Sequence, residues 1–378
     1  MPSRNYADSH PVLRVSSKRF AASPFLDRYA TAETVFGVYG GRLYPLSLGG
    51  DPVEGYWRLR RRAALFDVPE RPVEVGGPDA EQLLDLVLTR DVRRVAPGRA
   101  AYALACDERG GILVDGVLIR FAADRFWYVL ADGDFLGRLQ THALGRDVTV
   151  QDAGSWVVQV QGPASLDVLA AACDGGAPDP FPYFATRAAR IAGQDVVLSR
   201  TGWSGELGFE AYTLPGTDGA AVWDSLLAAG EPHGLAVEGL DSLGIRRIEA
   251  GILDNGTDID PTLTPFEAGL GRFVDLDKGP FVGGEALAAG PRHRLLYGIS
   301  SATAVPIAGA CVRQGDRVVG RVTTGAWSPF LERGIGYVRM VAAGDWVGVD
   351  VSLGDEEAGA EVVELPFYDP EKRIPRGR

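Results

Sequence analysis

Cysteine and histidine are scarce in this chain, with three and four of them among 378 residues. The cysteines lie far apart and never in a CxxC spacing, which disfavours a disulfide framework and a zinc knuckle. The histidines are isolated from one another, which disfavours a histidine metal cage and a serine–histidine relay. The residues concerned are Cys106, Cys173, Cys311, His10, His142, His233 and His293. We therefore expect no metal site and no disulfides.

Long hydrophobic runs are also missing. No apolar run approaches the ~20 residues that a membrane helix needs. The N-terminal stretch MPSRNYADSHPVLRVSSKRF has no continuous apolar core before a small-residue cleavage site, so it does not resemble a secretory signal. We expect a cytoplasmic protein that does not insert into a membrane.

Several standard catalytic motifs are absent. No GxGxxG opens a helix after a strand, and no GxxxxGK[ST] occurs, so we expect no NAD, no flavin and no P-loop chemistry. Ser204 resembles half a nucleophile elbow, but Glu206 stands where the elbow needs glycine. The acidic stretch 254–260 lacks the oxygen ligand and the glycine that a calcium loop needs at its third and sixth positions, so we expect an acidic turn with polar contacts.

Basic residues are outnumbered, because 50 acidic residues against 38 basic ones leave a net charge of −12. This charge repels phosphate backbones and disfavours nucleic acid as a partner. A small molecule is the expected partner, and a homodimer is left open. One basic cluster occurs at Arg58, Arg60, Arg61 and Arg62. We interpret it as a solvated helix face, with contact to an anionic tail as the alternative.

Length and pattern predict more than one domain, since 378 residues exceed the usual size of a single domain. Up to about residue 290 strands and helices alternate, and residues 56–66 show apolar positions at helical spacing. From 291 to 378 short strands follow at hairpin-like intervals, which predicts a small β-barrel or sandwich. A strand, a Gly-Pro turn and a helix occur at Val73–Leu88 and again at Val157–Ala172, which suggests an internal duplication.

Arg200–Tyr212, with the sequence RTGWSGELGFEAY, is the most informative stretch. Its three glycines separate two extended segments, and the side chains of Glu210 and Tyr212 project from the same face of the second segment. This pattern predicts a wall of a binding site, with a plain hairpin and a loose loop as the alternative. Asp115 is a second candidate, because a carboxylate on an apolar strand face is costly unless paired or used. Its alternative is a position in solvent at a bulge beside Gly116.

The remaining chemistry is that of a carboxylate in a glycine-rich cleft. A ligand with a cyclic amidine edge offers two parallel N–H donors, which a fixed carboxylate binds with two hydrogen bonds. Folates, pterins and guanine all present that edge. Glu210 is placed to hold it, with Trp203 or Tyr102 in contact with the ring. The residues alone predict this ligand class and do not choose a reaction.

At these residues the chain resembles the folate-dependent aminomethyltransferase superfamily, which includes the glycine-cleavage T protein and dimethylsulfoniopropionate demethylase. The matching segments are RTGWSGELGFEAY at 200–212, AGLGRFVDLDKGPFVGGEAL at 268–287, IRRIEAGILDNGTDID at 245–260 and CDERGGILVDGV at 106–117. The resemblance implies an α+β fold of three domains in a ring (a cloverleaf), two of them α+β and the last a β-barrel. Residues 1–290 would form the folate-binding region with two interleaved α+β domains, one from about 55 to 150, and residues 291–378 the barrel.

The resemblance also implies roles for single residues and a co-substrate, tetrahydrofolate. Glu210 matches the carboxylate that grips the pterin ring, and Asp115 matches the catalytic aspartate near folate N5. The slot before it, often acidic in the T protein, is Val114 here. The positions that match pocket-lining and folate-contacting residues are Tyr102, Trp203, Tyr212 and Arg247.

The branch within the superfamily decides the predicted reaction. Residues 66–71 lack the histidine that T proteins usually carry there and resemble the demethylase, whereas residues 40–45 differ from both branches. The first hypothesis is therefore methyl transfer from a small donor to N5 of tetrahydrofolate. A sulfonium such as dimethylsulfoniopropionate ranks first, because its neutral thioether leaves without an acid.

Three alternatives remain open. One is T-protein chemistry, which releases ammonia and forms methylenetetrahydrofolate from an aminomethyl group on a lipoyl carrier protein. Another is demethylation of an N- or O-methyl donor. The third is a folate-binding module without turnover, which the absence of that relative's reactive cysteine motif disfavours.

Overall fold

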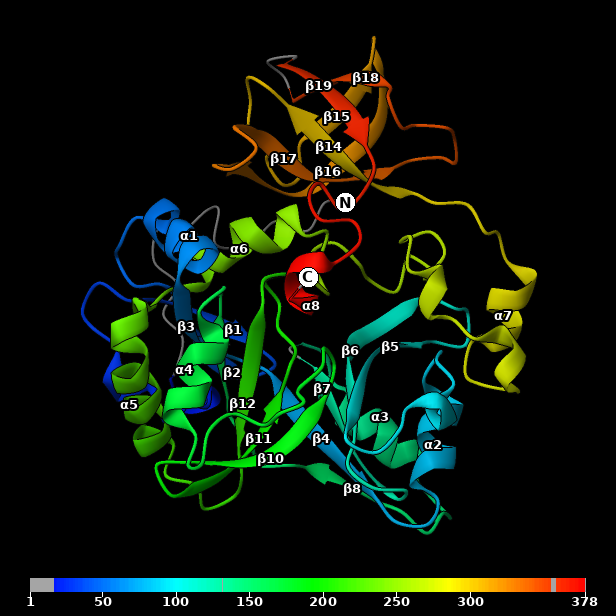
Figure 1. Cartoon of the computed structure of the whole chain (residues 1–378). Helices are drawn as coiled ribbons and strands as arrows, with labels where there is room; N and C mark the ends of the chain where they lie inside the picture. Colours follow the sequence, from blue (N-terminus) through cyan, green and yellow to red (C-terminus); the bar gives the residue numbers. More distant parts are fainter. Residues whose placement is uncertain (1–16, 131, 355–357, 378) are drawn as a thin grey trace.

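The computed structural model describes residues 17–130, 132–354 and 358–377. Its strands form a six-stranded sheet, a five-stranded sheet, a closed six-stranded barrel and a separate two-stranded hairpin. Figure 1 shows the two sheets with their helices as two lower lobes and the barrel as a third lobe above them. The predicted fold class, two α+β domains and a C-terminal β-barrel, is confirmed.

The five-stranded sheet has the order β5-β6-β7-β4-β8 and is antiparallel throughout. Two helices, α2 and α3, pack on it through buried residues such as Leu83, Leu84, Phe135 and Leu139. The elements are β4 (Arg71–Gly76), α2 (Ala80–Val87), β5 (Arg99–Cys106), β6 (Ile112–Arg120), β7 (Arg125–Leu130), α3 (Phe135–His142) and β8 (Thr149–Asp152).

The six-stranded sheet has the order β10-β11-β12-β9-β3-β13 and packs against helices α4 and α5. The chain enters this sheet with β3, leaves to form the whole five-stranded sheet and returns with β9, so the two lobes are interleaved. The elements are α1 (Pro52–Arg61), β3 (Ala63–Val68), β9 (Val157–Gln161), α4 (Ser165–Ala172), β10 (Thr186–Ile191), β11 (Gln194–Ser199), β12 (Gly208–Thr213), α5 (Gly219–Gly230), β13 (Leu235–Val237) and α6 (Leu240–Glu249).

The helix expected over residues 56–66 is wrong in its second half. Helix α1 ends at Arg61, and Ala63–Val68 form β3, in which every residue is buried. A short apolar run that is buried on both faces carries no periodicity, so its spacing does not distinguish a strand from the end of a helix.

The suggested duplication is visible in the topology. In each lobe a strand leads through a glycine turn into a helix, and the helix is followed by a three-stranded meander. The last strand of the meander pairs antiparallel with the strand that precedes the helix: β7 pairs with β4, and β12 pairs with β9. Gly77 and Gly162 open the two turns with φ of +125° and +119°. A Cβ at either would come within 2.7 Å or 2.6 Å of a backbone carbonyl oxygen, so both positions require glycine.

The barrel closes in the order β14-β17-β16-β15-β18-β19 around a core of its own. In Figure 1 the C-terminal helix α8 (Arg373–Arg376) lies near the centre of the ring of lobes. The remaining elements are β1 (Val35–Tyr39), β2 (Arg42–Ser47), α7 (Gly284–Ala289), β14 (Leu296–Ser301), β15 (Cys311–Gln314), β16 (Arg317–Ser328), β17 (Arg333–Met340), β18 (Asp350–Leu353) and β19 (Ala358–Val363). Within the described ranges, no helix is long and apolar enough to cross a membrane.

Candidate functional site

A cavity of about 1310 Å³ lies where the three lobes meet. Its wall is formed by both sheets, the β1–β2 hairpin, α6, barrel strand β16 and the segment that leads into α8. The six residues predicted to form the site come from separate parts of the sequence, and all of them line this cavity. They are Tyr102, Asp115, Trp203, Glu210, Tyr212 and Arg247.

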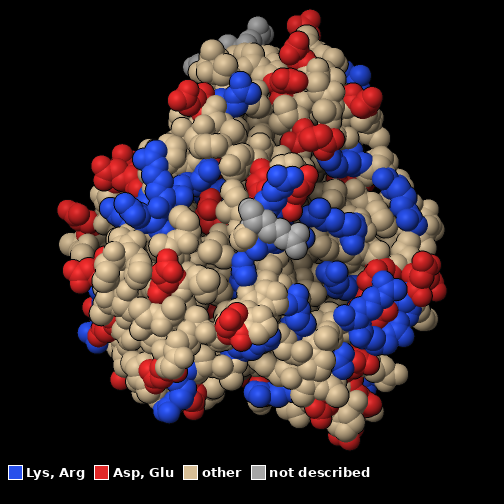
Figure 2. All heavy atoms as spheres, viewed as in Figure 1, with Lys and Arg blue, Asp and Glu red and all other residues tan. Residues whose placement is uncertain are grey.

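Basic side chains line one part of the cavity. Figure 2 shows Lys and Arg gathered over the middle of the face where the chain ends, although the chain carries a net charge of −12. Besides Arg247, the basic residues that line the cavity are Arg90, Arg99, Arg200, Arg272, Lys372 and Arg376. Arg200 also fastens the C-terminal segment, because its Nη2 donates to the carbonyl oxygen of Pro375 at 3.1 Å. A local excess of positive charge favours a ligand with an anionic end.

Glu210 lies on β12 and is 3% exposed. Thr201 Oγ1 and Tyr212 Oη both donate to its Oε2 at 2.5 Å, and Gln159 Nε2 donates to its Oε1 at 3.1 Å. Gln159 on β9 is the cross-strand partner of Glu210, so the two side chains leave the same face of the sheet. The stretch from Arg200 to Tyr212 therefore forms a wall of the cavity and not a loose hairpin loop.

Asp115 and Tyr102 lie on the neighbouring strands β6 and β5. Tyr102 Oη donates to Asp115 Oδ2 at 2.8 Å, which fixes the carboxylate at the cavity wall. Asp115 pairs in register with Leu104, and the register shift between the strands falls between Ala105 and Cys106. The alternative in which Asp115 tips into solvent at a bulge is therefore wrong.

The environment of Asp115 changes its acidity. Burial raises the pKa of Asp115 to about 6, the hydrogen bond from Tyr102 opposes this, and the nearby charge of Asp254 adds to it. A carboxyl group with such a pKa changes its protonation within reach of neutral pH, which is typical of groups at functional sites.

Arg247 lines the cavity, but protein groups occupy most of its donors. Its Nη1 donates to Asp258 Oδ2 at 2.5 Å and to the carbonyl oxygen of Ile252 at 3.1 Å, and Nη2 donates to Thr324 Oγ1 at 3.2 Å. Its Cζ lies 5.1 Å from the centroid of the Trp203 ring. Arg247 thus ties α6 to the following turn and to the barrel and supports the indole. Its direct contact with a folate stays a prediction.

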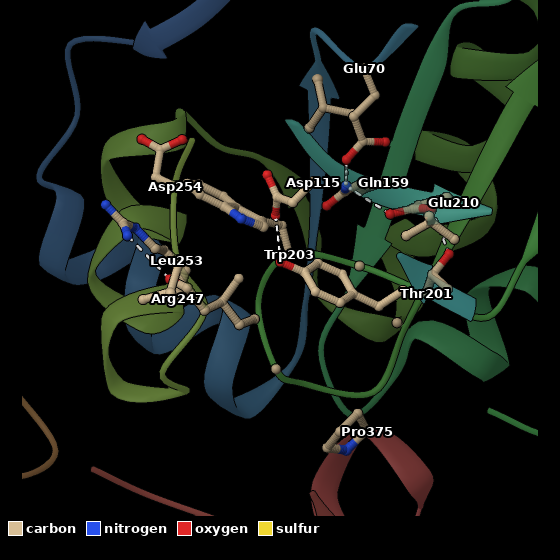
Figure 3. A pocket seen from close by; sticks show the side chains of 18 of the residues that line it. Glu70, Asp115, Gln159, Thr201, Trp203, Glu210, Arg247, Leu253, Asp254 and Pro375 are labelled. Carbon is tan, nitrogen blue, oxygen red and sulfur yellow. Dashed lines mark hydrogen bonds between the residues drawn. The ribbon is translucent and has the colours of Figure 1, made fainter. Parts of the chain in front are cut away.

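Glu70 and Gln159 line the cavity and were not among the predicted site residues. Glu70 follows β3, and its Oε1 accepts from Gln159 Nε2 at 2.9 Å, so one amide joins Glu70 to Glu210 (Figure 3). Glu70 Oε2 and Gln159 Oε1 are buried and have no hydrogen-bond partner in the described structure. The only signal in the sequence was a glutamine inside an apolar strand and an acid directly after one.

A second group missed from the sequence contains Asp254 and Asp132. Tyr39 Oη donates to Asp254 Oδ1 at 2.7 Å, and the backbone N–H of Gly40 donates to Asp132 Oδ1 at 3.3 Å. The β1–β2 hairpin also brings Tyr44 to the cavity, with 5.8 Å between the centroids of the Tyr39 and Tyr44 rings. In Figure 3 Asp115 lies between Asp254 and Glu210. The predicted acidic turn therefore contributes a cavity-lining carboxylate.

The arginine cluster at residues 58–62 is not the fully solvated helix face that the sequence predicted. The Arg60 side chain is 9% exposed, with Nε 3.1 Å from Glu206 Oε1 and Nη1 3.1 Å from Glu249 Oε2, so the solvated-face interpretation is wrong for this residue. All four arginines lie within the described ranges, and none of them lines the cavity. The anionic-tail alternative is therefore not supported for this cluster.

Two family models match the chain. The model described as GCVT N-terminal domain matches residues 30–278, and the one described as glycine cleavage T-protein C-terminal barrel domain matches residues 294–369. Among solved structures, the chain is similar to the crystal structure of glycine cleavage system aminomethyltransferase T from Bartonella henselae. The TM-score is 0.83 at 28% identity, covering 93% of this chain and 98% of that one.

Two relatives are named for different activities. An aminomethyltransferase from Streptomyces coelicolor is 37% identical and matches over 88% of this chain and 94% of its own length. A trimethylamine-oxide aldolase from Ruegeria pomeroyi is 33% identical over 93% of this chain, which matches only 47% of that protein.

Proposed function

The chain belongs to the glycine cleavage T-protein family, and on that basis we propose that it moves a one-carbon unit from a cationic amine donor to tetrahydrofolate. The superfamily predicted from the sequence is confirmed, as is the class of enzyme, a tetrahydrofolate-dependent one-carbon transferase. The names of the relatives favour the aminomethyltransferase alternative over the sulfonium demethylase that the sequence ranked first. The proposed donor is therefore an aminomethyl group on a lipoyl carrier protein, and the proposed location is the cytoplasm.

One observation carries this proposal: Glu210 and Asp115, from different sheets, line the same cavity. A volume of about 1310 Å³ exceeds that of most small-ligand pockets, so it has room for a folate and a donor group together. The unpaired acceptors on Glu70 and Gln159 fit the N–H groups of a reduced pterin. The basic residues of the cavity fit the anionic tail of a folate.

The chain's own residues would act by orientation and charge. Tetrahydrofolate, when bound, supplies the amine N5 that accepts the one-carbon unit. Asp115 would orient that amine and favour the positive charge that develops on it, while Tyr102 holds the carboxylate in place. Alignment of two reacting groups in one cavity can by itself supply ~7–11 kcal/mol of rate acceleration.

The region around Asp254 supports a cationic donor. Asp254 and Asp132 contribute negative charge, and Tyr39 and Tyr44 contribute aromatic rings. Carboxylates and aromatic rings both attract an ammonium group. Because Asp115 lies between Asp254 and Glu210 in Figure 3, a donor on the Asp254 side would meet a pterin on the Glu210 side at Asp115.

A free N-methylated amine is the second candidate donor. The trimethylamine-oxide aldolase relative is named for a methylated nitrogen compound, and such a donor would present the same positive charge to Asp254. A sulfonium shares that charge, but the names of these relatives do not favour it, and a neutral O-methyl donor gains nothing from the acidic region.

Product analysis tests the proposed function. The purified protein is incubated without oxygen with tetrahydrofolate and, in parallel, an aminomethyl-loaded lipoyl carrier protein, methylated amines, dimethylsulfoniopropionate or a methoxy compound. We expect methylenetetrahydrofolate and ammonia with the aminomethyl carrier. 5-Methyltetrahydrofolate from an N-methylated amine would favour the second candidate. Absence of any one-carbon folate in all reactions would contradict the proposal.

The pH dependence of turnover should report Asp115. Its pKa is raised to about 6 by burial, and the proposed role needs the carboxylate, so kcat/KM should be constant above that pH and fall about tenfold per unit below it. The measurement is a pH–rate profile from pH 5 to 8 with a stability control at each pH. A profile that is flat through pH 6 would argue against an ionised Asp115 in the rate-limiting chemistry.

A further inference from the structure

We propose that Glu70 is a second carboxylate for the pterin ring, so that Glu70 and Glu210, joined through Gln159, bind the N–H donors of a reduced pterin together. The inference rests on the proposed folate site and adds to it a residue that determines ligand specificity. It also changes the binding mode predicted from the sequence, in which Glu210 alone binds the amidine edge.

Glu210 has too few free acceptor positions to bind that edge alone. Its Oε2 already accepts from Thr201 and Tyr212 at 2.5 Å, and its Oε1 accepts from Gln159 at 3.1 Å. A carboxylate offers about four lone-pair positions, so about one remains, on Oε1. A bidentate amidine needs one position on each oxygen. Additional acceptors must therefore come from another residue.

Glu70 and Gln159 supply these acceptors. Glu70 Oε2 and Gln159 Oε1 are buried at the cavity without a hydrogen-bond partner among the described residues, and Gln159 is 0% exposed. The Nε2 of Gln159 donates to both carboxylates, so its Oε1 remains an acceptor. Buried acceptors without donors are unfavourable, and a ring with several N–H groups would satisfy them once both side chains turn towards the cavity, because neither oxygen has accessible surface as it stands.

The ionisation of Glu70 and Glu210 also favours a ligand with N–H donors. Burial raises the pKa of Glu70 and the nearby Glu210 raises it further, while burial raises the pKa of Glu210. In the described part of the chain, the groups that face the pair most closely are Gln159, Thr201 and Tyr212, and no cation is among them. N–H donors stabilise the ionised carboxylates that burial disfavours, so a ring with several N–H groups suits the pair. The amidine edge is the same in oxidised and reduced pterins, and the reduced ring adds an N8–H beside it, so Glu70 would favour reduced folates by accepting from N8–H.

The backbone holds Glu70 in position before any ligand binds. Arg42 Nη1 donates to the carbonyl oxygen of Glu70 at 2.7 Å, and the Arg42 guanidinium lies 4.0 Å from the centroid of the Trp156 ring. With the backbone fixed in this way, only the Glu70 side chain has to turn towards a ligand, so binding costs little conformational freedom.

Fragment binding tests the role of Glu70. Calorimetry without oxygen measures the affinity of the full chain for 6-methyltetrahydropterin, which is the ring alone, and for p-aminobenzoylglutamate, which is the tail alone. The variants are Glu70→Gln, Glu70→Asp and, as a matched control at an exposed carboxylate, Glu54→Gln. We expect Glu70→Gln to bind the ring about 10- to 100-fold more weakly and the tail as wild type does, because a charge-assisted acceptor becomes an amide. Glu70→Asp should lose less.

The outcomes separate this inference from the proposed function. If both Glu70 variants bind the ring as the Glu54→Gln control does, the inference is overturned and the folate site stands. Equal losses for ring and tail, or a lowered melting temperature in both variants, would assign Glu70 a structural role and also overturn it. If the wild-type chain binds neither fragment nor tetrahydrofolate, the proposed function itself fails.

Discussion

Asp115→Asn is expected to lower kcat about 10²- to 10⁴-fold while tetrahydrofolate still binds with nearly unchanged affinity. Asparagine keeps the size of the side chain and an acceptor for the Tyr102 hydroxyl, which lies 2.8 Å from Asp115 Oδ2. It removes the negative charge that would orient N5 and favour its developing positive charge. Single-turnover kinetics and calorimetry on the same preparation separate the two quantities, with Asp167→Asn on the exposed side of α4 as the control.

The same variant should be more stable than the wild type at pH 8. The folded-state pKa of Asp115 is raised to about 6, so the folded protein loses stability as pH rises through 6 and the group ionises. Asparagine has no charge, so its advantage of about 3 kcal/mol should be present above pH 6 and disappear below about pH 4. Thermal melts at both pH values check this. Loss of stability at pH 8 together with loss of activity would instead assign Asp115 a structural role.

Glu210→Ala is expected to weaken tetrahydrofolate binding about 100-fold or more, with a smaller effect on kcat at saturating folate. The variant removes an acceptor for the pterin and also leaves the hydroxyls of Thr201 and Tyr212 and the amide of Gln159 without their shared partner. Calorimetry measures the affinity, and initial rates measure the division between KM and kcat. Glu54→Ala is the surface control.

Effects of the two variants on different kinetic parameters would support separate roles for Asp115 in the reaction and Glu210 in folate binding. Asp115→Asn should change kcat and Glu210→Ala should change KM, because the first residue is placed at the reacting amine and the second at the far edge of the ring. Unchanged folate affinity in Glu210→Ala would contradict the placement of the pterin. A second comparison, between Glu210→Gln alone and in combination with Glu70→Gln, should show non-additive losses, since Gln159 joins the two carboxylates.

Local patterns in the sequence were sufficient to find much of the site. The glycines of the 200–208 stretch, the spacing of Glu210 and Tyr212 and the lone Asp115 on an apolar strand are all features of neighbouring residues. The structure brings these residues to one cavity, and the strand–turn–helix repeat was equally visible, because a glycine turn at a fixed place in each copy is a local requirement. The roles assigned to these residues remain predictions.

The rest of the site depends on pairings between distant segments. Glu70 and Gln159 are 89 residues apart and meet only because β3 and β9 are neighbours in a sheet that the chain leaves and re-enters. Tyr39 and Asp254 are 215 residues apart and form a direct hydrogen bond at the cavity wall. Arg60 looked solvent-facing because its acidic partners, Glu206 and Glu249, lie far along the chain. No local pattern contains this information.

The most direct test of the account is a crystal structure of the protein in complex with tetrahydrofolate. We predict a pterin inside the central cavity, with its amidine edge at Glu210 and Glu70, its N5 side towards Asp115 and its glutamate tail among the basic residues of the cavity. A folate bound outside this cavity, or bound in it with the tail at Asp115, would contradict the account.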